Sequence, residues 1–133
     1  MTRYFTLIAL AALALTACAT PPVKPENIFR VYFDPGKANL CCMDKQAIAD
    51  AANAYQNGGQ EIILAGHTDR SGSKELNTQL SKDRAVAVTA ALVKAGVPRE
   101  RIVTRYFGES SPYTKAGDGV ASSQDRRVLM IVR

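Results

Sequence analysis

The hydrophobic and polar positions of this chain follow two periods, and each period predicts one type of element. Four short apolar runs are rich in β-branched and aromatic residues, which predicts strands. These runs cover residues 28–33, 61–65, 102–107 and 128–132. Two longer segments repeat their apolar residues at helical spacing, over Met43–Gln56 and from Ser73, a favoured N-cap residue, to Ala95. The order of these elements predicts an α/β sandwich of four strands with the helices on one face.

The second predicted helix carries a charged residue on its apolar side. With about 100° per residue, Arg84 falls in the middle of the apolar stripe of this helix. The stripe consists of Leu80, Val88, Ala91, Leu92 and Ala95. A desolvated guanidinium without a partner costs several kcal/mol, so Arg84 must be paired or must line a pocket. Asn77 and Ser81 lie on the same side of the helix, toward its start, where their polar groups would complete such a pocket.

The second apolar run leads directly into the sequence Gly66-His67-Thr68-Asp69. Asp69 therefore lies where a buried strand reaches the surface, and its carboxylate is expected to face a pocket. Arg84 supplies the opposite charge fifteen residues later. Two interpretations stay open at this point: the two side chains close a structural ion pair, or they form a site for a zwitterion.

His67 is the only histidine of the chain, and it lies two residues before Asp69. A catalytic general base needs a nucleophile, a second carboxylate or a group of metal ligands near it. The sequence places none of these at a suitable spacing from His67. We therefore predict a structural, hydrogen-bonding role for His67. Thr68 and Ser81 are likewise expected to be hydrogen-bonding or capping groups. The alternative is a hydrolase or amidase that uses the Asp69 and His67 loop.

The first residues have the pattern of an export signal. Arg3 provides a short basic region, and Tyr4–Leu15 is an apolar stretch too short to span a bilayer. The stretch ends in Leu15-Thr16-Ala17-Cys18, which is similar to a bacterial lipobox. We predict a lipoprotein signal peptide over residues 1–17, with Cys18 lipidated and becoming the new amino terminus. The alternative is an ordinary signal peptide that is cleaved nearby.

Residues 18–27 are expected to form a short tether between Cys18 and the folded domain. Three prolines in this stretch predict a stiff, extended segment. Fully stretched, it would span about 30 Å at roughly 3.3 Å per residue. Residues 28–133 are then predicted to form one folded domain.

The charge balance argues against nucleic acid as a partner. The chain has 17 Lys and Arg residues, 12 Asp and Glu residues and a net charge of +5. The positive residues are scattered along the sequence and form no basic stripe. This mild excess suits an anionic membrane surface or a cell wall.

Two adjacent cysteines, Cys41 and Cys42, remain once Cys18 is assigned to lipid. Together with His67 they lack the spacing and the number of ligands of a zinc site, so we predict no metal site and no cofactor. In an oxidising compartment the pair could form a strained vicinal disulfide, bridge to another chain, or stay as two small core-facing thiols. We favour the core-facing thiols.

A set of residues at fixed offsets resembles a known family. The set is Gly66-His67-Thr68-Asp69, Gly72, Asn77, Leu80-Ser81, Arg84-Ala85, Val88, Gly96-Val97, Gly108-Glu109, Pro112 and Arg126-Arg127-Val128. This pattern resembles the OmpA-like C-terminal domain that binds peptidoglycan. The resemblance covers roughly residues 28–132 and implies a βαβαββ arrangement with a mixed four-stranded sheet. With the lipobox, the architecture looks like that of the peptidoglycan-associated lipoproteins of Gram-negative bacteria.

The resemblance also implies a binding function and assigns residues to it. In the family, the residues that match Asp69 and Arg84 hold the diaminopimelate residue of the peptidoglycan stem peptide. Backbone groups after the first strand, here Phe33 and Asp34, lie near the ligand, and Asn77 helps to shape the site. The arginine pair of the last motif places one more arginine there, which we assign to Arg127.

The implied protein is not an enzyme. It would be lipid-anchored in the outer membrane, would face the periplasm, and would bind peptidoglycan together with envelope proteins. Three positions depart from the family pattern: Asp125 stands where Asn is usual, Leu129 stands where many members have Glu, and Cys41-Cys42 replace a polar helix start. The alternative function is a scaffold that binds protein partners in an envelope assembly.

Overall fold

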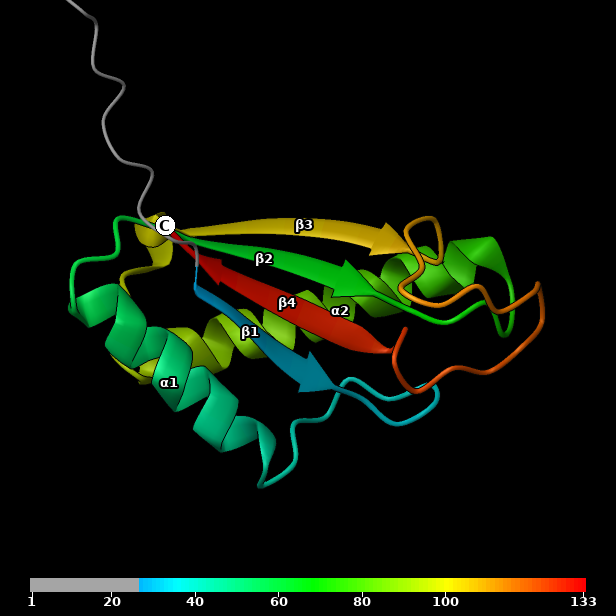
Figure 1. The fold of residues 1–133 in the computed structure, drawn as a ribbon, viewed down its shortest axis with the longest axis horizontal. Helices are drawn as coiled ribbons and strands as arrows, with labels where there is room; N and C mark the ends of the chain where they lie inside the picture. The colour runs from blue at the N-terminus through cyan, green and yellow to red at the C-terminus, as the bar shows by residue number, and fades with distance from the viewer. Residues whose placement is uncertain (1–26) are drawn as a thin grey trace, which may run out of the picture.

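The computed structural model describes residues 27–133, which form two helices on a four-stranded sheet (Figure 1). The predicted signal peptide, Cys18 and nearly all of the predicted tether lie outside the described residues. The elements follow in the order β1 (Asn27–Tyr32), α1 (Asp44–Gln56), β2 (Ile62–His67), α2 (Lys74–Lys94), a 3₁₀ turn (Arg99–Arg101), β3 (Ile102–Gly108) and β4 (Arg127–Val132). All of the predicted strands and helices are present.

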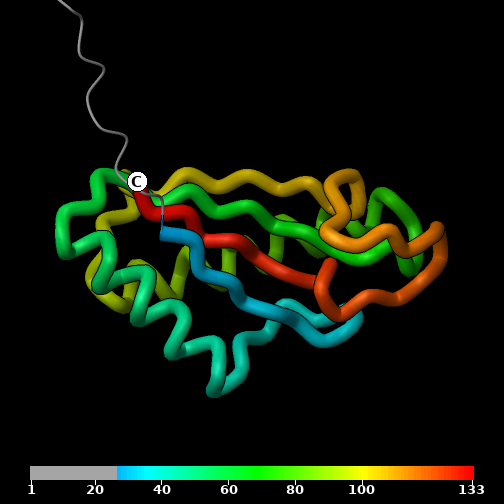
Figure 2. The backbone as a smooth tube through the Cα atoms, in the orientation of Figure 1, coloured from blue at the N-terminus to red at the C-terminus, as the bar shows by residue number. Residues whose placement is uncertain are grey.

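The strands are ordered β1-β4-β2-β3, so the last strand of the chain lies between the first two. β2 and β3 are parallel, whereas β4 is antiparallel to both of its neighbours, β1 and β2. Because the sheet is mixed and both helices cover one face of it, the predicted fold class is confirmed. The tube in Figure 2 shows the last strand, β4, between β2 and β1, the strand that begins the described chain.

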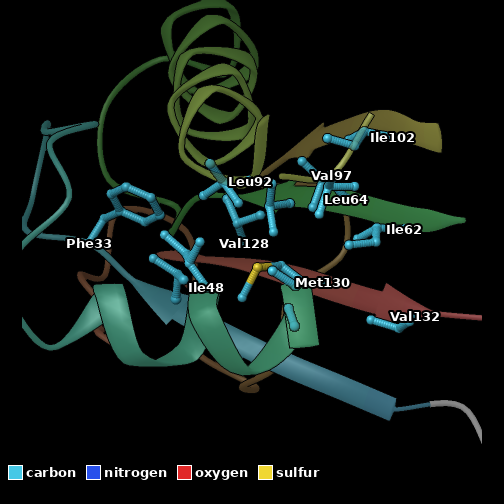
Figure 3. Close-up of a cluster of buried hydrophobic side chains, with 14 residues drawn as sticks. Phe33, Ile48, Ile62, Leu64, Leu92, Val97, Ile102, Val128, Met130 and Val132 are labelled. Carbon is cyan, nitrogen blue, oxygen red and sulfur yellow. The ribbon is translucent and has the colours of Figure 1, made fainter. Parts of the chain in front are cut away.

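The hydrophobic core fills the space between the sheet and the helices (Figure 3). Leu64, Val128 and Met130 point from the central strands toward Ile48 of α1 and Leu92 of α2. These side chains alternate along their strands with residues of the other face, as the period of two requires. Burying an aliphatic side chain of this size stabilises the fold by about 1.5–3 kcal/mol, so the core holds the strand ends in fixed positions.

α2 begins and ends where its sequence predicts. The Oγ of Ser73 accepts a hydrogen bond from the backbone N–H of Leu76 at 3.3 Å, and Gly96 follows the helix with a φ of 96°. The buried face, however, differs in part from the predicted stripe, because Leu80 is only partly buried and Ala95 is exposed. The buried residues are Asn77, Ser81, Arg84, Ala85, Val88, Thr89 and Leu92. The first half of α2 thus packs polar residues against the sheet end, and Arg84 is buried there as predicted.

The close approach of α2 to β2 requires a glycine. A Cβ at Gly66 would lie 2.3 Å from the backbone oxygen of Ser81, which is closer than real contacts allow. The absence of a side chain at Gly66 therefore lets the polar half of α2 lie directly on the end of β2.

The prediction of core-facing thiols is wrong for both adjacent cysteines. Cys41 and Cys42 are exposed and free. They belong to the loop before α1, where the carboxylate of Asp44 accepts a hydrogen bond from the N–H of Cys41 at 2.7 Å. This contact ties the loop to the first residue of α1, whereas the first residue of α1 in the buried hydrophobic core is Ile48. Within residues 27–133, neither helix combines the length and the hydrophobicity that crossing a membrane requires.

Candidate functional site

The residues predicted to bind a ligand gather at one end of the sheet. β1 and β2 end there, β4 begins there, and the loops that follow or precede them form that end of the molecule (Figure 1). Asp34 follows β1, Asp69 follows β2, and Arg126 precedes β4. The topology thus brings together three positions that are far apart in the sequence.

Asp69 is almost completely buried, and both of its carboxylate oxygens accept hydrogen bonds. Oδ1 accepts from the hydroxyl of Ser71 at 2.6 Å and from its N–H at 3.4 Å. Oδ2 accepts from the N–H of Ser122 at 3.2 Å and from Nη1 of Arg126 at 2.9 Å. Burial alone would raise the pKa of Asp69, but the hydrogen bonds from Ser71, Arg126 and Ser122 outweigh it and hold the pKa below its ordinary 3.8. Asp69 is therefore ionised at neutral pH.

Arg84 is fully buried and is held by three backbone carbonyl groups. Its Nε donates to Lys37 O at 2.9 Å, Nη1 to His67 O at 3.1 Å, and Nη2 to Asp34 O at 3.0 Å. The guanidinium also lies over the ring of Phe33, 5.1 Å from its centroid. Burial lowers the pKa of Arg84 to about 10, against the opposing effect of the Asp69 charge, so Arg84 stays protonated at neutral pH. Arg84 thus joins the loop after β1 to the end of β2.

The partner of Asp69 is Arg126, a residue that the sequence pattern named only within a pair. Arg126 also donates from Nε to Phe33 O at 2.9 Å, and the backbone N–H of Phe33 donates to Arg126 O at 2.9 Å. These contacts extend the pairing of β1 and β4 by one residue beyond the sheet. The buried ion pair anticipated for Asp69 and Arg84 is therefore made by Asp69 and Arg126.

Arg127, which we assigned to the ligand, lies at the same end of the sheet but lines neither of the clefts that contain Asp69 or Arg126. It is buried in β4 near the carboxylate of Asp125 at 3.7 Å, and its guanidinium lies over the ring of Tyr113 at 5.4 Å. The sequence could have indicated Arg126. Side chains alternate along a strand, and Arg126 lies two residues before Val128, which belongs to the core. Arg126 is therefore expected on the face of the sheet that the helices cover, where Arg84 lies, and Arg127 on the opposite face.

Asp125 anchors the long loop that covers this end of the sheet. It is 1% exposed, and its carboxylate accepts from the N–H groups of Tyr113 at 2.6 Å and Thr114 at 3.0 Å. The hydroxyl of Thr114 donates to the second carboxylate oxygen at 2.5 Å. Asp125, which replaces the family's usual Asn, therefore has a clear structural role. The loop that it holds in place contains Ser122, whose N–H donates to Asp69.

Asn77 has a comparable role at the start of α2. It is 4% exposed, and its side-chain amide donates to Ser71 O at 3.0 Å and to Oε2 of Glu109 at 2.7 Å. The first bond holds the backbone of the residue whose hydroxyl contacts Asp69. Asn77 thus contacts the same residue, Ser71, that binds the carboxylate of Asp69, and it lies in the lining of the same cleft.

Two clefts meet at the Asp69–Arg126 pair. One, of about 440 Å³, is lined by Gly36, Asp69, Ser71, Gly72, Leu76, Asn77, Gln79, Leu80 and Asp83. The other, of about 500 Å³, is lined by Tyr32, Phe33, Asp34, Asn39, Cys41, Asp44, Ser123, Gln124 and Arg126. Each cleft contains one member of the ion pair. The ion pair therefore links the lining of a cleft that contains Asp69 and Asp83 to the lining of a cleft that contains Arg126, Asp34 and Asp44.

His67 borders neither of these clefts. It is buried, its ring stacks on Phe107 with 5.2 Å between centroids, and its backbone oxygen accepts from Arg84. Burial, assisted by the charge of Arg127, lowers the pKa of His67 to about 4. The ring is therefore neutral at pH 7, and its Nδ1 has no hydrogen-bond partner within the described chain. Its structural contribution comes from ring packing, from a hydrogen bond between the ring and the backbone of Ser111, and from its backbone carbonyl. Among residues 27–133, no three His, Cys, Asp or Glu side chains are grouped as a metal site requires.

Known proteins share both the sequence pattern and the fold. A peptidoglycan-associated lipoprotein of Legionella pneumophila is 38% identical over 83 residues, which cover 62% of this chain and 47% of the relative. One from Rhizobium meliloti is 31% identical over 131 residues, 92% of this chain and 73% of the relative. The chain thus spans about half the length of the first relative and about three quarters of the second.

The same similarity holds in three dimensions. The crystal structure of the peptidoglycan-associated lipoprotein from Burkholderia pseudomallei superposes with a TM-score of 0.72 at 26% identity, over 79% of this chain and 90% of that one. Residues 32–126 match the sequence model described as the OmpA family, and they include β1's last residue, both helices and all of the site. The chain belongs to the OmpA family.

Proposed function

We propose that this protein binds peptidoglycan without chemically changing it, and so tethers a lipid-anchored envelope protein to the cell wall. Its membership in the OmpA family and its similarity to proteins named peptidoglycan-associated lipoproteins support this function. The ligand group is the side-chain end of diaminopimelate in the stem peptide, which carries an ammonium and a carboxylate on one carbon.

The observation that carries this proposal is the Asp69–Arg126 pair between two clefts. A ligand with adjacent opposite charges can exchange with an internal ion pair, because each protein group then keeps a partner of opposite sign. In the bound state, the ammonium lies against Asp69 and the carboxylate against Arg126. The 2.9 Å separation of the two protein groups fits a ligand whose charged groups share one carbon. A fork of two N–H groups on Arg126 gives the carboxylate a defined orientation.

Arg84 acts beneath this pair. All three of its nitrogens already donate to backbone carbonyls, and it is fully buried. These bonds use three of the five N–H groups of the guanidinium, so a direct bond from Arg84 to the ligand carboxylate, as the family resemblance implies, would require the ligand to reach a fully buried side chain. We propose that Arg84 supports binding by its charge and by holding the backbone of Asp34, whereas Arg126 takes the exposed position.

The test is a pulldown of the whole chain with insoluble peptidoglycan that contains diaminopimelate, repeated with peptidoglycan that has lysine at that position. Lysine lacks the second carboxylate, so binding to the lysine type is expected to fall at least tenfold. Asp69→Asn should reduce binding to the diaminopimelate type to the same extent. Asp83→Asn is the matched control, since Asp83 lines the same cleft and accepts a bond from Gln79. Equal binding by folded Asp69→Asn protein would refute the site.

The absence of catalysis is part of the proposal. His67 is neutral, buried and outside both clefts, and Asp69 is held by four hydrogen bonds that keep it ionised. A general acid or base needs access to the reacting group. Prolonged incubation of the protein with peptidoglycan is expected to release no soluble muropeptides, and their release in proportion to protein concentration would contradict a purely binding role.

We further propose that the protein is anchored in the outer membrane through Cys18 and faces the periplasm. The lipobox supports the anchor, and relatives named Outer membrane protein A support an association with the outer membrane. Replacement of Cys18 by Ser should remove the lipid mass and shift the protein from the membrane to the soluble fraction. A lipidated mass that persists in Cys18→Ser protein would contradict this assignment.

A further inference from the structure

β3 forms one edge of the sheet (Figure 1). A groove lies beside this strand. In residues 27–133, no strand pairs with the outer side of β3. An edge strand presents N–H and C=O groups that another extended chain can pair with. β1 is the other edge, but the cleft at β1 reaches only its last residue. The groove beside β3, in contrast, is lined by two residues of the strand, Thr104 and Tyr106.

The groove has a volume of about 570 Å³ and lies between β3 and a second apolar face of α2. It is lined by Lys82, Val86, Thr89, Ala90, Val93, Arg99, Thr104 and Tyr106. Val86 is 55% exposed, Val93 43% and Tyr106 48%, so large apolar surface lies open on both of its sides. This face is separate from the core face of α2, which contains Val88 and Leu92. α2 is thus apolar on two sides, and its own chain covers one of them.

The dimensions of the groove fit an extended peptide. Lys82 and Val93 are eleven residues apart on the helix, which corresponds to about 16 Å at roughly 1.5 Å per residue. An extended chain rises about 3.3 Å per residue, so about five residues would cover this length. Residues that alternate between groove and solvent could place two or three apolar side chains against Val86 and Val93.

The charges decide what kind of chain fits. The ionisable groups in the groove lining are Lys82, Arg99 and Tyr106, so it offers two cations and no carboxylate. The chain neighbours of the lining residues include both signs, Arg101 and Arg105 as well as Asp83 and Glu100, so the excess of positive charge comes from the groove lining itself. A second copy of this chain, paired through its own β3, would bring these lining cations together across the interface. Like charges placed opposite each other are destabilising, which disfavours self-pairing.

We propose that the β3 edge and the α2 groove bind an extended, acidic segment of a partner protein, which adds a fifth strand to the sheet. Its backbone pairs with β3, its apolar side chains at alternate positions fill the groove, and its carboxylates lie near Lys82 and Arg99. This mode of recognition combines main-chain bonds for affinity with side-chain contacts for specificity. The surface involves none of the residues of the Asp69 site, so this inference does not rest on the proposed function.

The probe for this surface is a fluorescein-labelled heptapeptide of alternating glutamate and valine, titrated against the whole chain by fluorescence anisotropy. Binding is expected to weaken at least tenfold when lysine replaces glutamate, and also when sodium chloride rises from 50 to 500 mM. In amide NMR spectra, the peptide should shift resonances of residues 82–93 and 99–106. Equal affinity for the lysine peptide, or shifts confined to other residues, would overturn the proposal.

Two further measurements separate strand addition from other occupants. The double variant Val86→Glu with Val93→Glu should reduce peptide affinity at least tenfold, whereas Val120→Glu, at a comparably exposed loop valine, should leave it within twofold. A peptide N-methylated along its pairing edge should also lose affinity, and full retention would overturn strand addition. Sedimentation that shows dimers dissociated by the double variant would assign the surface to a second copy instead.

Discussion

Asp69 and Arg126 are 57 residues apart in the sequence, yet their side chains form an ion pair of 2.9 Å with only 5% and 12% of their side chains exposed. The pair connects the end of β2 to the start of β4, and each member lines a different cleft. A zwitterion that replaces this contact gives each charge a new partner of opposite sign, so neither charge is left unpaired. This relationship, together with the buried Arg84 beneath it, gives rise to most of the predictions that follow.

Arg126→Ala should affect binding more than folding, and Arg84→Ala should affect both. Arg126 is partly exposed and makes two side-chain bonds, whereas Arg84 is fully buried and makes three. We expect Arg126→Ala to lower peptidoglycan binding at least tenfold with a loss of about 1–3 kcal/mol in unfolding free energy. Pulldown and urea unfolding of both variants check this. Unchanged peptidoglycan binding by Arg126→Ala would show that the ligand carboxylate does not bind Arg126 and would favour Arg84 as its partner.

Arg84→Lys tests whether the shape of the guanidinium matters apart from its charge. A lysine keeps the charge but cannot reach Lys37 O, His67 O and Asp34 O together. The unfolding free energy should fall by about 2–4 kcal/mol, since buried carbonyls lose their donors. Arg70→Lys is the control, because Arg70 pairs with the exposed Asp118 at the surface. That variant should change stability by less than about 0.5 kcal/mol, and equal effects of the two substitutions would contradict the role given to Arg84.

The stability of the domain should decrease as the pH falls from 6.5 to about 4. Burial lowers the pKa of His67 from 6.5 to about 4, so in this range the unfolded chain binds a proton that the folded chain does not. Protonation therefore favours unfolding, and the contribution of His67 is complete only above pH 6.5. Asp69 and Asp125 have pKa values below 3.8, so their contributions are lost at still lower pH.

The single histidine makes this prediction easy to check. One set of imidazole proton resonances in NMR spectra should titrate near pH 4, and urea unfolding between pH 7 and 4.5 should show the loss of stability. His67→Phe preserves an aromatic ring beside Phe107 and should flatten the stability profile over this range. A His67 titration near 6.5 in the folded protein would show that the ring is not desolvated as described.

Gly66→Ala should be strongly destabilising. The new methyl group would lie 2.3 Å from Ser81 O, an atom of the α2 backbone that cannot move without displacing the helix. We expect a loss of at least about 2 kcal/mol in unfolding free energy, because overpacking a rigid contact forces backbone shifts. At Gly117 a methyl group would meet nothing within 4 Å, so Gly117→Ala should stay within about 0.5 kcal/mol. Thermal unfolding of both variants decides the matter, and equal midpoints would refute the close approach.

The sequence by itself determined the elements and much of the site. Its apolar periods placed each strand and helix, and the stripe of α2 indicated a buried Arg84. The motif that ends in Asp69 located the carboxylate at the end of a buried strand. These inferences succeed because side-chain periodicity reports which face of one element is buried, and that information is local to the element.

Only the tertiary structure decided which groups meet at the ends of those elements. The partner of Asp69 is Arg126, Arg84 binds backbone carbonyls, and Cys41 and Cys42 lie outside the core. The physical reason is that strand order and loop paths bring distant backbone groups together, and a backbone carbonyl is present at every residue. Local patterns could therefore show that Arg84 needs a partner, but the assembled fold had to select that partner.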